Sequence, residues 1–335
     1  MNKYLYTFLI SSLVLATACK KGNEVTEEPK VENTTPVTVP AFSKDSAYAF
    51  VQKQVSFGPR VPGSEAHKAM QAWIVQQFKK YGATVTEQSF KANFATIGEK
   101  RCTNIIAAYN PKYARRVVLA AHWDTRYAAD EDPTKPKEPA DGADDGGSGV
   151  GILLEIARLI QQNPIPLGVD IILFDAEDQG DSEGEAETWC LGSQYWVANP
   201  HTKGYRADYG ILLDMAGAKG AVFTKEDLSQ VFQAEKANKI YQHYDRLWQL
   251  AAGMGHGNMF LNTRGRALTD DHLFVNNYTT IPMIDIINRP VNSKTGFGAY
   301  WHTHDDNMSV IDPQTLGVVG QVVTAYVYRS VKNPS

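Results

Sequence analysis

Basic charge, cysteine and long apolar runs are all scarce in this sequence. Its 33 Lys and Arg residues are outnumbered by 37 Asp and Glu residues, for a net charge of -4. Because no basic excess exists to neutralise phosphates, nucleic acid is not an expected partner. What the 335 residues do contain, 43% apolar and 21% charged, is ordinary for a globular chain and enough to bury a sizeable core.

One apolar run stands out, and it lies at the N-terminus. Leu5–Ala18 has the length of the hydrophobic region of a signal peptide and is too short for a confident membrane span. The small residues before Cys19 fit a bacterial lipoprotein signal peptidase, and an overlapping Ala-x-Ala site fits ordinary signal peptidase. We therefore expect a signal peptide over 1–18 and an exported lipoprotein that faces the periplasm or cell surface. A lipid on Cys19 is its only expected membrane contact, and a soluble periplasmic protein is the alternative.

The segment after the signal peptide predicts a tether. Residues 20–40 are polar, charged and rich in Pro and Thr, so they cannot bury enough apolar surface to offset the entropy of ordering them. We assign 19–42 to the lipidated N-terminus and flexible tether.

Three cysteines are present, and with Cys19 assigned to the lipid only Cys102 and Cys190 remain. Export permits a disulfide between these two. Two separate buried thiols fit the sequence equally well, because the sequence does not fix the distance between them.

Apolar runs of strand length alternate with helical patterns over the rest of the chain. Near-continuous apolar runs, typical of strands covered on both faces, are Arg116–Ala121, Val169–Phe174, Tyr209–Leu213 and Ile281–Ile287. Half-buried strands are expected at Thr84–Phe90 and Asn104–Tyr109. After two N-terminal helices, helical patterns lie at Gly149–Gln162, Leu191–Ala198, Ala234–Met254 and Pro313–Tyr328. The alternation predicts a three-layer α/β/α sandwich with a mostly parallel mixed central sheet, as a single catalytic domain over 43–331.

Ionisable residues gather at the ends of these elements. His122, Asp178 and Asp214 come soon after three of the buried strands, where open α/β sheets bind ligands. His302 follows the last strand through a loop, and Asp145 precedes a helix. Each alone has an ordinary explanation as a surface turn or helix cap, but together the carboxylates would repel one another unless a cation lies among them. Imidazole and carboxylate ligands without cysteine suit a catalytic zinc, and three protein ligands leave one coordination position open.

Seven short motifs follow one another along residues 43–331. They are Gly58–Ser64, His122–Asp124, Gly142–Gly149, Glu177–Asp178, Leu213–Asp214, Asp271–His272 and His302–Thr303. In this order they resemble the zinc exopeptidases of the M28 type. The resemblance implies the aminopeptidase-like zinc exopeptidase fold, with Asp145, Asp178 and His302 as metal ligands.

Within that superfamily, the sequence resembles the glutaminyl cyclases more than the aminopeptidases. Trp301 directly precedes His302, and Thr269–Phe274 is similar to a cyclase segment. The chain is thus identified as a bacterial member of the animal-type glutaminyl cyclases (glutaminyl-peptide cyclotransferases), which use one zinc. Such enzymes convert the N-terminal glutamine of peptides or proteins to pyroglutamate and release ammonia. Two departures are Asp178, where the animal enzymes have Glu, and Thr269, where they have Gln.

The resemblance also implies roles for individual residues. Glu177 would move a proton from the attacking amine to the departing nitrogen. Asp214 and Asp270 would hydrogen-bond each other and the leaving amide nitrogen, and Trp301 would form a wall for the substrate. Trp189 is a candidate for a second pocket tryptophan, with core packing an equal alternative.

An M28-type aminopeptidase is the alternative function. It would bind two zinc ions, with His122 and Asp214 on the second ion and Asp145 bridging. Trp301 and Asp270 have no evident role in hydrolysis, which favours the cyclase. A binding lipoprotein with a relic site would be expected to lack the base, yet Glu177 is present. His304, which is not a family feature, is expected at the rim of the site.

Overall fold

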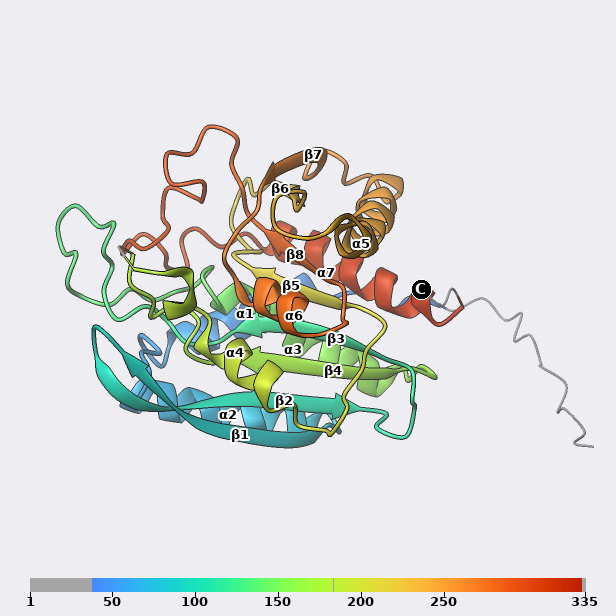
Figure 1. Ribbon diagram of the computed structural model, residues 1–335, viewed down its shortest axis with the longest axis horizontal. Coiled ribbons are helices and arrows are strands. Elements are labelled where there is room, and N and C mark those ends of the chain that lie inside the picture. Colours follow the sequence, from blue (N-terminus) through green and yellow to red (C-terminus); the bar gives the residue numbers. More distant parts are fainter. Residues whose placement is uncertain (1–37, 183, 333–335) are drawn as a thin grey trace, which may run out of the picture. The chain divides into compact units, whose positions relative to one another are not determined.

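A six-stranded mixed sheet runs through the centre of the computed structural model (Figure 1). In spatial order its strands are β1 (Thr84–Phe94), β2 (Gly98–Tyr109), β4 (Gly168–Phe174), β3 (Arg116–His122), β5 (Gly210–Asp214) and β8 (Met283–Ile287). The last four run parallel to one another, while β2 is antiparallel to both of its neighbours. The predicted mostly parallel mixed sheet is confirmed.

Helices cover both faces of this sheet, as Figure 1 shows. One face carries α1 (Lys44–Val55), α2 (Glu65–Lys80), α3 (Gly147–Gln162) and α7 (Pro313–Ser330), and α5 (Ala234–Gly253) packs against α7 and the edge strand β8. The opposite face carries α4 (Leu191–Ala198) and α6 (Asp271–Tyr278). The predicted three-layer sandwich is therefore also confirmed.

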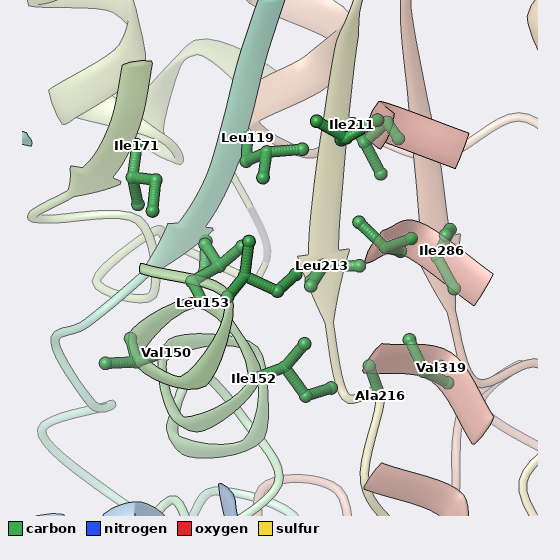
Figure 2. Close-up of a cluster of buried hydrophobic side chains, with 14 of the residues drawn as sticks. Leu119, Val150, Ile152, Leu153, Ile171, Ile211, Leu213, Ala216, Ile286 and Val319 are labelled. Carbon is green, nitrogen blue, oxygen red and sulfur yellow. The ribbon is translucent and has the colours of Figure 1, made fainter. Parts of the chain in front are cut away.

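The apolar runs of the strands are explained by this double cover. In β3, Val117 and Leu119 belong to the core on the α3 side, whereas Val118 and Ala120 belong to the core on the α4 and α6 side. Since successive side chains of a strand point to opposite faces, both faces of a doubly covered strand must be apolar. Figure 2 shows part of the larger core, where side chains of neighbouring strands meet those of α3 and α7: Leu119, Ile171, Ile211, Leu213, Ile286, Leu153 and Val319.

Three features of the fold were not predicted. The predicted strands at Thr84–Phe90 and Asn104–Tyr109 are confirmed within β1 and β2, but the hairpin also pairs through its largely polar outer end, to Phe94 opposite Gly98. A second, two-stranded parallel sheet joins β6 (Phe223–Asp227) to β7 (Phe260–Arg266). The third feature is α6, which begins directly after Asp270. The strands β6 and β7 and the helix α6 are short and partly polar, and such segments carry little hydrophobic periodicity, the signal on which sequence interpretation depends.

The structure describes residues 38–182 and 184–332. The predicted signal peptide, the lipid site at Cys19 and nearly all of the tether lie outside these residues. The described residues belong to a single compact unit. None of the helices in this part of the chain is both long enough and apolar enough to cross a bilayer. Cys102 and Cys190 are both buried with free thiols, so the alternative of two separate thiols holds.

Candidate active site

The predicted zinc ligands come together at the carboxyl ends of the parallel strands. Asp145, Asp178 and His302 are all buried, and each offers a ligand atom within 4.8 Å of the other two. His302 Nε2 lies 3.1 Å from Asp178 Oδ1 and 3.9 Å from Asp145 Oδ2. Burial and the negative charge of Asp178 raise the pKa of Asp145 to about 6. A cation bound among these groups would offset that repulsion, and the nitrogen and oxygen donors suit zinc.

His302 is oriented by a residue that the sequence did not single out. Its Nδ1 lies 2.8 Å from Asp130 Oδ1, and Arg126 Nε donates to the same oxygen at 2.9 Å. With Nδ1 engaged by a carboxylate, Nε2 is the ring nitrogen left to bind a metal. His302 has a φ of 55°, a left-handed conformation that non-glycine residues rarely adopt. Nothing distinguishes Asp130 in sequence from the other acidic residues of its loop.

A second possible metal group adjoins the first. His122 Nε2 lies 2.9 Å from Asp145 Oδ1 and 3.1 Å from Asp214 Oδ1, and all three residues are buried. The chain therefore holds donors for either a one-zinc or a two-zinc arrangement. Asp145 does not cap α3, whose N-cap is Gly146 without a side-chain hydrogen bond, so a helix cap does not explain this residue.

A sharp turn after β4 presents Glu177 beside the ligand Asp178. Ala176 has a φ of 60°, and the backbone nitrogens of Glu177 and Asp178 donate to the two oxygens of Asp124 at 3.1 and 3.3 Å. Asp124 thus fixes the turn, a role the sequence did not reveal. Burial, reinforced by the negative charges of Asp270 and Asp178, raises the pKa of Glu177 well above its usual range.

Asp270 lies close to Glu177. Its Oδ1 accepts the backbone N–H of Asp271 at the start of α6, and its buried Oδ2 has no hydrogen-bond partner. Asp214 contacts His122. Its predicted hydrogen bond with Asp270, which requires a proton shared by the two carboxyl groups, stays a prediction. Burial and the nearby charge of Asp214 raise the pKa of Asp270 well above its usual range.

Both candidate tryptophans line the cavity over these groups. The cavity has a volume of about 420 Å³, and its walls include Glu177, Asp270, Trp189 and Trp301. Trp301 stacks on His302 with ring centroids 3.6 Å apart. The Trp189 ring lies 6.3 Å from the His302 ring and lines the same cavity, and Trp189 belongs to none of the buried core clusters of the described residues. His304 is partly exposed, and its Nδ1 lies 2.9 Å from Asp132 Oδ2 outside the cavity lining.

Carboxylates and imidazoles at the carboxyl ends of a parallel sheet, under a small aromatic cavity, define an α/β metalloenzyme of the zinc-exopeptidase architecture. Comparison with known proteins narrows this class. The model of peptidase family M28 matches residues 104–327, and the chain belongs to this family.

Individual relatives agree with this assignment. The chain is 48% identical to a glutaminyl cyclase of Porphyromonas gingivalis, with a TM-score of 0.81 over 86% of this chain and 99% of that one. A Zn-dependent exopeptidase of Parabacteroides distasonis is 46% identical, with a TM-score of 0.82 over 87% of this chain and 99% of that one. The glutaminyl-peptide cyclotransferase of Drosophila melanogaster is 26% identical over 285 residues, which cover 80% of this chain and 76% of the relative.

Proposed function

We propose that this chain is a zinc-dependent glutaminyl-peptide cyclotransferase, an acyltransferase that converts N-terminal glutamine of peptides or proteins to pyroglutamate and releases ammonia. The observation that carries the proposal is the cavity in which Glu177, Asp270 and Trp301 surround one side of the metal group. At about 420 Å³ it has the size of a small-molecule site. The similarity to named glutaminyl cyclases of animals and bacteria supports the same activity.

The reaction joins two ends of the same residue. The α-amine nitrogen of the substrate attacks the side-chain amide carbonyl carbon, a C–N bond forms, and the bond to the amide nitrogen breaks. Asp145, Asp178 and His302 would hold a zinc ion, which would supply a Lewis acid for the side-chain carbonyl. Glu177 takes one proton from the attacking amine and returns it to the departing nitrogen, which leaves as ammonia.

The remaining cavity residues position the substrate. Asp270 Oδ2 is buried without a partner, so it can accept a hydrogen bond from the amide N–H that is to leave. Trp301, stacked on His302, offers a flat wall to the five-membered ring that forms. Trp189 closes the cavity nearby, and both rings exclude water, whose attack at the same carbonyl would yield glutamate instead.

We further propose that one zinc suffices. In that case His122 stays in contact with Asp145 and Asp214 and helps to orient them. An aminopeptidase is the second candidate, since the same three residues could hold a second zinc.

One assay separates these functions. The purified chain is incubated with a peptide that begins with Gln and with one that begins with Leu, and the products are followed by mass. Loss of ammonia from the first supports the cyclotransferase; hydrolytic release of Leu from the second supports the aminopeptidase.

Substitution of the base sharpens the assay. Glu177→Gln should lower kcat by roughly 100-fold to 10,000-fold, the usual contribution of a general base, while zinc content stays at the wild-type level. Glu187→Gln is the matched control, because Glu187 is exposed on the nearby segment and does not line the cavity. Wild-type turnover in Glu177→Gln would overturn the mechanism.

We also propose that the chain is an exported lipoprotein anchored through Cys19, a proposal that rests on the sequence pattern alone. Cys19→Ser should move the protein from the membrane fraction to the soluble periplasmic fraction. An unchanged distribution would contradict the anchor.

A further inference from the structure

We propose that Cys190 is a positioning residue for Glu177, holding the carboxylate through a thiol hydrogen bond. The inference rests on the proposed function, in which Glu177 moves the proton. Cys190 itself does not line the cavity, so it acts on the substrate only through Glu177.

The contact is between Cys190 Sγ and Glu177 Oε1, which lie 3.3 Å apart. Among the described residues, this is the one hydrogen bond that the Glu177 side chain makes. His122 Nδ1, at 3.8 Å from Glu177 Oε2, is too far for a hydrogen bond. The Asp270 carboxyl group also lies nearby, within 4.8 Å of both Glu177 and Cys190, but is not hydrogen-bonded to either among the described residues. The thiol therefore fixes one carboxylate oxygen and leaves the other to reach the substrate.

The backbone around Cys190 keeps this contact in place. Cys190 N donates to the Glu177 carbonyl at 3.0 Å, and Leu191 N donates to the Ala176 carbonyl at 3.0 Å. These two bonds join the start of α4 to the turn that carries Glu177. A change in the position of one segment would therefore displace the other.

The backbone conformation of Cys190 and the protonation of its thiol both bear on this contact. Cys190 has a φ of 56°, in the left-handed region that favours glycine or asparagine. A cysteine is unfavourable in this conformation. Burial, together with the negative charge of Glu177, raises the pKa of the Cys190 thiol well above its usual range. The sulfur thus keeps its proton and remains a donor.

Three substitutions test the role in the full chain with zinc bound. Cys190→Ala removes the donor and should lower kcat roughly 10-fold to 100-fold, the effect of losing a hydrogen bond to a charged group, with KM and zinc content unchanged. Cys190→Ser restores a donor and should recover kcat to within about 3-fold of wild type. Cys102→Ala is the matched control: Cys102 is equally buried and its cluster includes Ala176, but it makes no contact with Glu177.

A spectroscopic measurement keeps the proposal testable should Cys190→Ala not fold. The S–H stretching band of Cys190 is identified as the infrared band lost in Cys190→Ser. In Glu177→Gln this band should shift to higher frequency, because the amide is a weaker acceptor than the carboxylate. A band at the wild-type position would overturn the proposal.

The outcomes separate the two proposals. A wild-type chain that releases no ammonia from Gln peptides contradicts the proposed function. An active wild-type chain in which Cys190→Ala keeps its kcat contradicts only the role of Cys190. Equal losses in the Ala and Ser variants, with a raised KM or less zinc, would show that Cys190 serves packing alone.

Discussion

Replacing Gly149 by alanine tests how closely α3 must approach the sheet for the site to form. Gly149 lies in the first turn of α3, and a Cβ there would overlap the carbonyl oxygen of Leu213 in β5. The same Cβ would lie 2.9 Å from the Cβ of Ala121 in β3. Since carbon atoms in contact prefer about 3.5–4.0 Å, relief of the Ala121 contact alone requires the helix to retreat by roughly 0.6–1.1 Å, and the closer Leu213 oxygen requires at least as much.

Two opposing effects set the size of the destabilisation. Alanine is favoured over glycine inside a helix by about 1 kcal/mol. Overpacking a close-packed core costs about 1–3 kcal/mol. We expect an overpacking cost at the upper end of this range, because the Leu213 carbonyl belongs to a strand that is paired with both β3 and β8 and cannot move alone. The free energy of unfolding of Gly149→Ala should therefore fall by about 2 kcal/mol.

The displacement of α3 should also move the residues that are predicted to bind zinc. Asp145 comes two residues before α3, and Asp214 ends β5 directly after Leu213. Separating these elements pulls the ligands apart, so zinc affinity should fall as well. Urea unfolding measures the stability, and zinc retained during dialysis against a graded chelator measures the affinity.

A second glycine provides the control. Gly253 is the last residue of α5, it is exposed, and a Cβ there would have no neighbour within 4 Å. Gly253→Ala should leave stability unchanged or raise it by up to about 1 kcal/mol. The reasoning is refuted if Gly149→Ala is as stable as wild type while Gly253→Ala behaves as expected.

Three further predictions concern zinc and pH. Asp130→Asn keeps an acceptor for His302 Nδ1 but removes the charge, so zinc affinity in a competition titration should drop about 10-fold to 100-fold; wild-type affinity would contradict the orienting role. Chelation should lower both turnover and the Tm, and added zinc, but not magnesium, should restore them, because imidazole is a poor magnesium ligand. Burial, assisted by the charge of Arg246, lowers the pKa of His243 to about 4. The unfolded state therefore binds more protons between pH 4 and 6.5, and stability is lost as the pH falls through that window. Urea titrations at pH 8 and pH 5 should show wild type losing about 2 kcal/mol more than His243→Asn; equal losses would exclude this source of acid sensitivity.

Much of the fold could be predicted because its signals are local. Four strands are apolar along their length because helices cover both of their faces: β3 (Arg116–His122), β4 (Gly168–Phe174), β5 (Gly210–Asp214) and β8 (Met283–Ile287). Each of these strands can be recognised from its own residues, without the rest of the sequence. The rule that parallel strands bind ligands at their carboxyl ends then predicts that Asp145, Asp178 and His302 share one region. The strands of the outer hairpin were predicted only in part, at Thr84–Phe90 and Asn104–Tyr109, and their extensions to Phe94 and from Gly98 were not. The β6–β7 sheet was missed because its strands are short and largely polar.

The sequence by itself thus determined the chain's elements, the order of its motifs and the kinds of side chain that meet at the strand ends. Only the tertiary structure decided how those side chains are held. Asp130 orients His302 from 172 residues away, Asp124 fixes the Glu177 turn across 53 residues, and Cys190 reaches Glu177 through a left-handed backbone. Such contacts depend on the relative placement of loops to within a few tenths of an ångström. That placement is set by the packing of the whole sandwich, and no local pattern of residues encodes it.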